Sequence, residues 1–324
     1  MDPRVSEAAP DVSSDRTATP KPRGNGARRG RVRGGLRFVR RNPLLSFGIM
    51  VVAGSIFLAL FGPMLAPYDP ESPTGTVSAP PPNPLRVPGL VVATIKGDLE
   101  KPVHWFGTDS AGLDVFSRVI AAPRIDVLVA ISAAALSLVI GTLLGLVAGY
   151  SRGRWSEFMT RVSDVIQAFP VFILAMILVV LSGRNLLNIV IAIAFLSVPI
   201  FLRLTRSHVL TQRNRTYVEA ARVLGNRESV IALKHVLPNS LAPSLIQSSV
   251  MVGWGILLVA GLSFIGAGVR PPTPEWGGMI ATGSNLIILG EWWPSIFPGI
   301  AISITVFGYA IVGNVLERRY GGSA

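Results

Sequence analysis

Long apolar runs separated by polar segments dominate the chain from Leu44 onward. A helix needs about 20 such residues to cross the hydrocarbon core of a bilayer. Six runs are candidates for this: Leu44–Met64, Val127–Tyr150, Val165–Gly183, Asn185–Leu202, a stretch within Leu241–Val269, and Pro294–Leu316. The runs are continuously apolar and do not alternate with polar residues, so they indicate helices and not barrel strands. We therefore expect an all-α, polytopic membrane protein with six transmembrane helices.

The runs also divide the chain. We expect a basic tail over 1–43, a first transmembrane helix over 44–64, and an extracytoplasmic segment over 65–126. A five-helix core over 127–317 contains a polar loop, 206–238, and is followed by a short end, 318–324. The uncharged stretch Gly277–Gly290 is too short to span. We expect it to be re-entrant or interfacial, with a seventh span as the alternative.

Charge predicts the orientation. The net charge is +12, and the tail carries eleven of the Lys and Arg residues against four acids. The loops 151–161 and 203–234 and the C-terminal Arg318 and Arg319 are also basic, whereas the segment after the fifth span has only Arg270. Lys and Arg concentrate on the cytoplasmic side of membrane proteins, so both termini are predicted to be cytoplasmic, with the tail contacting anionic membrane lipids. No nucleic-acid-binding fold accompanies the charge, and we expect no nucleic-acid partner.

The residues that several kinds of catalytic or metal-binding site require are absent from the sequence. The chain has no cysteine and no G-x-x-x-x-G-K-[ST] phosphate loop. The six runs as drawn contain no Asp, Glu, Lys or Arg, which argues against a carrier that couples to protons or sodium. The three histidines, His104, His208 and His235, are scattered outside the runs. We expect no catalytic residue and no metal site, and any energy source has to lie on another chain.

A glycine stripe marks the second run. Gly141, Gly145 and Gly149 follow one another at four-residue spacing, which places them on one helix face. Such a face allows a neighbouring helix to approach closely. Helix packing is the favoured interpretation, and lining a substrate path is the alternative.

The loop between the fourth and fifth runs is polar and helix-prone. Glu219-Ala220-Ala221 forms a small-residue surface with one acidic edge, and Gly225 suits the C-terminal cap of that short helix. A second short helix is expected over Ser229–Val236, with Pro238 starting the next segment. Two short helices at an angle form a knob that suits a cleft on a cytoplasmic partner. An amphipathic helix lying on lipid headgroups is the alternative, and these residues alone do not decide between them.

The spacing in this loop resembles the cytoplasmic signature of the inner-membrane permeases of ABC importers. That signature is EAA, three residues, Gly, nine residues, then an apolar residue, one residue and Leu-Pro. It is matched by Glu219, Ala220, Ala221, Gly225, Leu237 and Pro238. His235 takes the place of the first apolar position, as is common in the peptide-importer branch. Further segments resemble the C-type permeases of dipeptide and oligopeptide importers: Phe106–Ile120, Asp164–Pro170, Leu262–Ile280 and Glu291–Gly299. Leu113 departs from the basic residue usual before Asp114, and the end GNVLERRY lacks the usual Asp-rich ending.

The resemblance implies the type I importer permease fold, a place in the cell membrane, and no enzymatic activity in this chain. It implies four further subunits: a second homologous permease, two ATPases that bind ATP and Mg, and an extracytoplasmic substrate-binding protein. In this picture Glu219 contacts the ATPase, Ala220 and Ala221 allow close approach, and Gly225 sets the angle between the short helices. The implied cargo is a dipeptide or oligopeptide, with nickel chelates, haem or glutathione as alternatives. A receptor or sensor that holds a signalling partner is the alternative from another class.

The same resemblance draws attention to Asp109, Gly112 and Asp114 in the extracytoplasmic segment. They could contact the binding protein or cover the mouth of the pore. Asp and Gly also form turns for purely local reasons, and a turn is the favoured interpretation.

Overall fold

The computed structural model describes residues 42–84, 87, 90–91, 103–151 and 153–320. The chain divides into Met1–Pro43 and a compact unit, Leu44–Ala324, and only the second unit is considered below. The predicted tail over 1–43 lies almost wholly outside the described residues, as do residues 321–324 of the predicted C-terminal end. The described residues form helices with no strand, apart from one isolated bridge between Thr108 and Asp114. The all-α prediction is confirmed.

Five segments of the described chain are long and apolar enough to cross a membrane. Their helices are α2 (Pro43–Leu65), α4 with α5 (Val115–Ala121 and Pro123–Tyr150), α8 (Leu186–Gln212), α10 through α11 (Glu228–Ile231 to Leu237–Phe264), and α13 (Trp293–Tyr320). A bent pair, α6 (Arg154–Ala168) and α7 (Val171–Ser182), raises the number to six if it counts as one span. The remaining elements are α9 (Thr216–Val223), the π-helix η2 (Ala232–Val236), α12 (Trp276–Ser284) and the 3-10 helix η3 (Ile287–Leu289).

The third predicted run, Val165–Gly183, is not one straight helix. The axes of α6 and α7 meet at an angle of 91°. The break falls at Phe169 and Pro170, where Phe169 is extended (φ −81°, ψ 144°). A residue before proline avoids the helical region, and proline lacks the N–H that would continue the ladder, so the chain turns here.

The predicted end of the fourth run at Leu202 is wrong. Helix α8 continues to Gln212, so Arg203 and Arg206 lie on the helix and not in a loop. In contrast, the stretch Gly277–Gly290 does not span: α12 has nine residues and is followed by the single turn η3. A 3-10 turn closed by Gly290 at φ 87° ends this segment before α13 begins.

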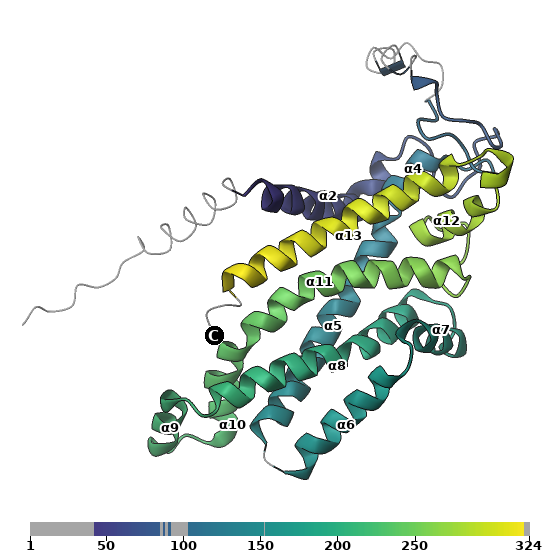
Figure 1. The fold of residues 1–324 in the computed structure, drawn as a ribbon. Coiled ribbons are helices and arrows are strands. Elements are labelled where there is room, and N and C mark those ends of the chain that lie inside the picture. The colour runs from purple at the N-terminus through teal and green to yellow at the C-terminus, as the bar shows by residue number, and fades with distance from the viewer. Residues whose placement is uncertain (1–41, 85–86, 88–89, 92–102, 152, 321–324) are drawn as a thin grey trace, which may run out of the picture. The chain divides into compact units, whose positions relative to one another are not determined.

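Helix α5 is central to the compact unit and packs on α8 and α11, while α11 also packs on α13 (Figure 1). The glycine stripe faces α8: a Cβ on Gly145 would lie 2.7 Å from the Leu202 carbonyl oxygen and from Thr205 Cβ. Gly141 and Gly149 meet α8 equally closely, through Phe201 and Val209. The stripe therefore lies at a helix–helix seam, because only a glycine face admits a second backbone this near.

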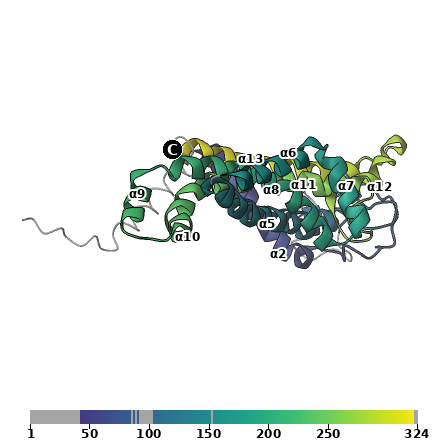
Figure 2. The ribbon, with the colours of Figure 1, turned by 90° about the horizontal axis from the view of Figure 1, so that it is seen from below.

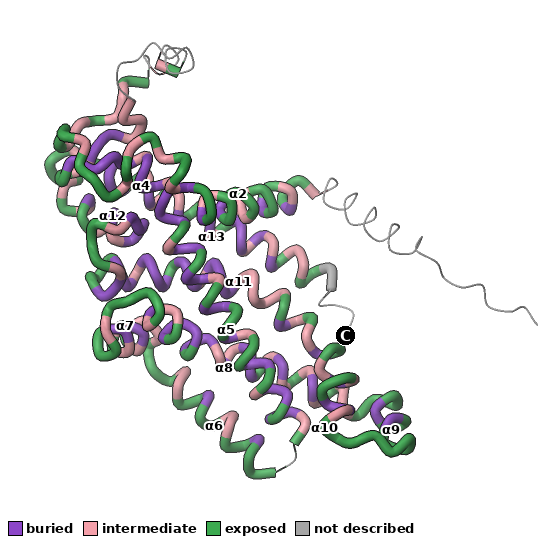
Figure 3. Tube along the Cα trace, turned by 180° about the vertical axis from the view of Figure 1, so that it is seen from behind, coloured by how far each residue is buried: buried purple, intermediate pink, exposed green. Residues whose placement is uncertain are grey.

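The two ends of the bundle differ in what they carry. Figures 1 and 2 both show α9 and α10 at one end, and α7 and α12 at the other. We call these the α9 end and the α12 end. Burial follows the central helices: long buried stretches run along α5, α8 and α11, whereas α6 is mostly exposed or half-buried (Figure 3). The only buried residues of α6 are Ser156 and Ser163.

Candidate functional site

The loop at the α9 end has a defined helix stop. Helix α9 ends at Val223 with Leu224 as its C-cap, and Gly225 adopts the left-handed conformation with φ 78°. The Gly225 N–H donates to the Arg222 carbonyl at 2.9 Å, and the Asn226 N–H donates to the Ala221 carbonyl at 3.2 Å. These two bonds form a Schellman cap, which satisfies carbonyls that a helix end leaves open. The role of Gly225 is thus conformational, since a Cβ at this position would have no neighbour within 4 Å.

Pro238 lies in the first turn of α11, where a proline is tolerated. Helices α10, η2 and α11 follow one another without a gap, so the helical path continues through Pro238. The π-turn explains this: the Leu237 N–H donates to Ala232, five residues back, which widens the turn before the proline. Carbonyls around it are satisfied by side chains, with Asn239 Nδ2 donating to His235 O at 2.6 Å and Ser240 Oγ donating to Val236 O at 2.9 Å. The second short helix of the loop is therefore the beginning of a span.

The loop is anchored to the spans by its own small core. Seven buried apolar residues from the loop and from α5 and α8 form it: Leu146, Val209, Val218, Ala221, Ile231, Ala232 and Val236. On the surface, Arg222 Nε pairs with Glu228 at 2.7 Å and so joins α9 to α10, and the Tyr150 hydroxyl at the end of α5 donates to the same Glu228. The Glu228 carboxylate raises the pKa of Arg222. These contacts join the loop to α5 and α8 and to the α10–α11 segment.

The outward surface of α9 has polar and apolar parts. Glu219 and Ala220 are exposed, and Glu219 has no side-chain partner within the described residues. Ala221, which we expected on this surface, points inward instead, because it lies one turn from the buried Val218. Of the other residues in the motif, His235 and Leu237 are half-buried and Pro238 is exposed.

Two large apolar side chains at the tip of the loop were not predicted from the sequence to belong to its surface. Val223 and Leu224 are 87% and 80% exposed at the tip of the loop, directly before the capping glycine. Large apolar side chains at such exposure mark a contact surface when they lie next to one another. Their position in the sequence could have indicated this exposure. They are two apolar residues at the end of a polar helix, and no other large aliphatic residue of α9 lies on the same helix face.

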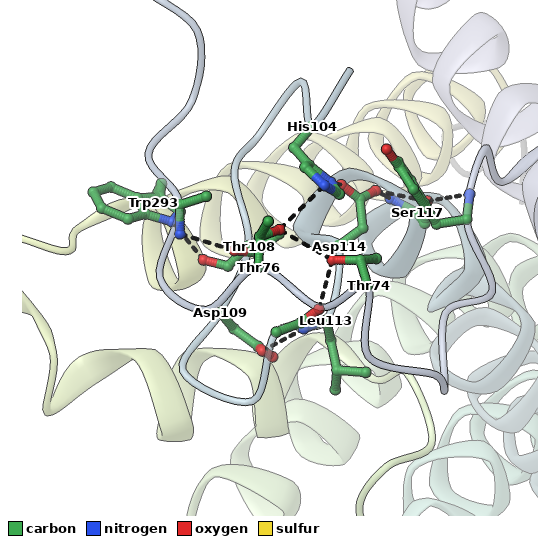
Figure 4. Close-up of polar contacts among 12 residues, drawn as sticks. Thr74, Thr76, His104, Thr108, Asp109, Leu113, Asp114, Ser117 and Trp293 are labelled. Atoms are coloured by element: carbon green, nitrogen blue, oxygen red, sulfur yellow. Dashed lines mark hydrogen bonds and ion pairs between the residues drawn. The ribbon is translucent and has the colours of Figure 1, made fainter. Parts of the chain in front are cut away.

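Asp109, Gly112 and Asp114 belong to a tight turn at the α12 end (Figure 4). Asp109 Oδ1 accepts hydrogen bonds from the backbone N–H groups of Ala111 (2.9 Å) and Leu113 (2.8 Å). Gly112 has φ 75°, and its carbonyl accepts from both the N–H and the hydroxyl of Thr74. The turn is therefore closed by its own chain.

Asp114 is the buried centre of this region. It caps α4: its Oδ2 accepts from Ser117 N at 2.8 Å and from Ser117 Oγ at 2.6 Å. Its Oδ1 lies 2.8 Å from His104 Nδ1, and the His104 ring stacks on Tyr68. Trp293 of α13 ties the same turn down by donating to Thr108 O at 2.9 Å (Figure 4). The carboxylates of Asp109 and Asp114 accept hydrogen bonds from their own chain. This arrangement corresponds to the interpretation of the motif as a turn.

Two carboxylates that lie outside the six predicted runs are buried in the structure. Asp126 in the first turn of α5 is fully buried, and Glu275 before α12 is 3% exposed. Together they cap α12: Asp126 accepts from Trp276 N, and Glu275 accepts from Gly277 N and Gly278 N. Burial raises the pKa of Glu275. Asp126 precedes the apolar run by one residue, so its burial could not be deduced from where the run begins.

Both carboxylates belong to the α12 end, and each accepts a hydrogen bond from the start of α12, where negative charge is favoured. Within the described residues, no three His, Asp or Glu side chains lie close enough to hold a metal ion. The buried acids therefore serve the architecture of this end.

The fold and the two motifs agree with what the chain resembles among known proteins. Residues 141–322 match the family described as binding-protein-dependent transport system inner membrane component. Residues 33–81 match the N-terminal TM domain of oligopeptide transport permease C.

Individual relatives cover most of the chain. The dipeptide transport system permease protein DppC of Alkalihalophilus pseudofirmus is 35% identical over 86% of each chain. The di/tripeptide transport system permease protein DppC of Pseudomonas aeruginosa is 37% identical, over 83% of this chain and 85% of its own. The glutathione transport system permease protein GsiD of Pectobacterium atrosepticum is 34% identical over 87% of each. With a family match over more than half of its length and the helical bundle described above, this chain belongs to the binding-protein-dependent transport system inner membrane components.

Proposed function

We propose that this chain is a permease subunit of an ATP-driven importer that carries short peptides into the cytoplasm. A second, homologous permease completes the pathway, two ATPase subunits bind and hydrolyse ATP with Mg, and an extracytoplasmic binding protein delivers the cargo. This chain has no catalytic residue in the scheme. Both termini and the α9 end face the cytoplasm, in agreement with the basic loops.

The single observation that carries the coupling role is the rigid, outward-facing surface of α9. The unpaired Glu219 and the exposed Leu224 lie on a short helix that is fixed to three spans by a buried core. An ATPase that closes on ATP would push this surface, and the core would pass the movement to α5, α8 and α11. Lipid docking of this basic loop is the alternative.

The proposed cargo rests on the relatives, which are named for dipeptides, di- and tripeptides and glutathione. Glutathione is itself a modified tripeptide, so one pathway of similar width and polarity could suit all of them. Glutathione is therefore the second candidate.

Uptake in a peptide-requiring host tests this function. The chain is expressed with its genomic neighbours, and uptake of a labelled dipeptide, a labelled tripeptide and labelled glutathione is measured. We expect ATP-dependent uptake that requires the binding protein, and that competes with unlabelled peptide. A Gly225→Asp variant should insert into the membrane and lose uptake, because the substitution strains the cap and adds charge beside the tip. Normal uptake in that variant would exclude the coupling role.

A further inference from the structure

A group of polar side chains lies on the exposed faces of three spans. Asp164 and Gln167 come from α6, Arg203 from α8 and Gln247 from α11. Gln167, Arg203 and Gln247 line one hollow of about 470 Å³, together with Ile200 and Leu204. Asp164 joins the group through an ion pair, with its Oδ1 lying 3.8 Å from a guanidinium nitrogen of Arg203. We call these four residues the polar face.

The polar face lies within the length of the spans, toward the edge of the hydrocarbon on the side of the α9 end. At 1.5 Å per residue, Arg203 lies about 26 Å along α8 from Leu186, and Gln247 lies about 26 Å from Phe264 along α11. The hydrocarbon core is about 30 Å thick. Both side chains therefore lie at the same level and within reach of the hydrocarbon, on the half nearer the α9 end.

Lipid is a poor environment for this face. The side chains of Arg203 and Asp164 remain 45% and 58% exposed in spite of their ion pair, and no hydrogen bond to the amide of Gln167 or Gln247 is present in the described part of the chain. An arginine can extend its head toward the headgroups, but a short Asp and two amides cannot. Charged and polar groups at membrane depth face a protein interior or a water-filled cavity, where they mark substrate routes.

The face also continues toward the α9 end. A second hollow of about 630 Å³ is lined by residues of α6 and α8 that include Asp164, Arg206 and Arg213. Asp164 of this hollow pairs with Arg203 of the first, so the ion pair links the two hollows. Arg213 donates to Gly149 O at 2.8 Å and keeps a buried Nε without a partner. A polar track thus extends from the level of Gln247 to the end of α8.

We propose that the polar face is a contact surface for the peptide in transit on the cytoplasmic half of the route, a proposal that rests on the function proposed above. Amides of Gln167 and Gln247 can each donate to and accept from a peptide main chain. A short peptide is a zwitterion. When the ion pair between Arg203 and Asp164 opens, the peptide carboxylate can bind Arg203 and the peptide ammonium can bind Asp164. That pair is long and half-exposed, and exposed pairs contribute little, so exchanging it for the cargo has a low cost. The track lined by Arg206 and Arg213 leads the cargo onward.

The absence of cysteine makes a direct test available, since any thiol introduced is the only one in this chain. Gln167→Cys and Gln247→Cys are made singly in the complete transporter, reconstituted in vesicles with cysteine-free partner subunits. Val139→Cys on α5, which is 56% exposed on an apolar face, is the matched control. Each variant is treated with a charged, membrane-impermeant thiosulfonate and, separately, with a lipid-soluble maleimide. Uptake by the unmodified wild type is measured first, which tests the proposed function by itself.

We expect the cysteines at both glutamine positions to react with the charged reagent. A saturating concentration of dipeptide, present during turnover, should slow this reaction at least about threefold. The bound label should block uptake. Val139→Cys should react only with the maleimide. Three results would overturn the proposal: reaction of Gln247→Cys with the maleimide alone, which means lipid contact; reaction with the charged reagent only when the second permease is left out, which means a subunit interface; or labelling without protection by peptide and without loss of uptake.

Discussion

Two glycine-containing motifs at opposite ends of the bundle use similar residues in opposite ways. Gly112 at the α12 end and Gly225 at the α9 end both adopt a left-handed conformation, with φ 75° and 78°. Around Gly112 the nearby carboxylates of Asp109 and Asp114 accept hydrogen bonds from their own chain. Near Gly225 the carboxylate of Glu219 has no such partner in the described residues, and large apolar side chains stay exposed.

The difference indicates that the acids at the α12 end maintain the fold, whereas the acid at the α9 end is available to bind a partner. A carboxylate that accepts backbone hydrogen bonds inside the protein fixes a turn, and its loss leaves buried donors unsatisfied. An exposed carboxylate beside exposed apolar side chains contributes little to folding and is free to bind a second protein. Substitutions at the two ends should therefore fail in different ways.

The largest effect on folding is expected from Asp114→Ala. The change removes two hydrogen bonds to Ser117, one of which caps α4, and the partner of His104 from a buried site, and we expect a loss of about 3 kcal/mol in stability. Thermal unfolding of the purified chain in detergent measures it. Asp69→Ala, in an exposed turn of the same segment, is the control and should change the midpoint little. Equal midpoints for the two variants would contradict the structural role of Asp114.

A smaller effect at the same end depends on pH. Burial raises the pKa of Glu275 above its ordinary value of 4.5, so the folded protein binds this proton more tightly than the unfolded chain. Stability from this group is then complete below the ordinary value and is lost as pH rises through the raised pKa. We expect the midpoint of thermal unfolding to fall over that range in the wild type, and Glu275→Gln to flatten the dependence. An unchanged slope in the variant would show that Glu275 is not responsible.

The smallest expected effect on folding lies at Gly225. Gly225→Ala should cost about 1 kcal/mol because a residue with a Cβ resists positive φ. Gly225→Asn should cost less, because Asn tolerates this conformation better. The space around the position is open, so the order of the two variants separates conformation from crowding. If Ala were the better tolerated of the two, the cap would not depend on the left-handed conformation.

The sequence predicted the features that depend on composition and local period. The apolar runs predicted the spans, and the four-residue spacing of Gly141, Gly145 and Gly149 placed them on one face. Gly225 was recognised as a helix cap because its conformational reason is local.

The features that were missed depend on contacts between distant segments. Asp126 and Glu275 are 149 positions apart, and only the fold brings both to the start of α12. Ala221 faces inward because of how α9 rotates onto α5 and α8, which its own segment does not determine. Pro238 lies in the first turn of α11, where a proline is tolerated, but the π-turn that joins α11 to α10 without a gap was not predicted.

The most direct test of the coupling role is the amount of ATPase that the permease retains. The chain is tagged, co-expressed with the second permease and the ATPase subunits, and purified, and the ATPase bound per chain is measured. Leu224→Asp places a charge at the exposed tip of α9, whereas Ile288→Asp does the same at the other end, where the side chain is 91% exposed. We expect Leu224→Asp to retain at most about a tenth of the ATPase that the wild type binds, while Ile288→Asp retains it in full. Full retention of the ATPase by Leu224→Asp would show that the tip of α9 is not the coupling surface.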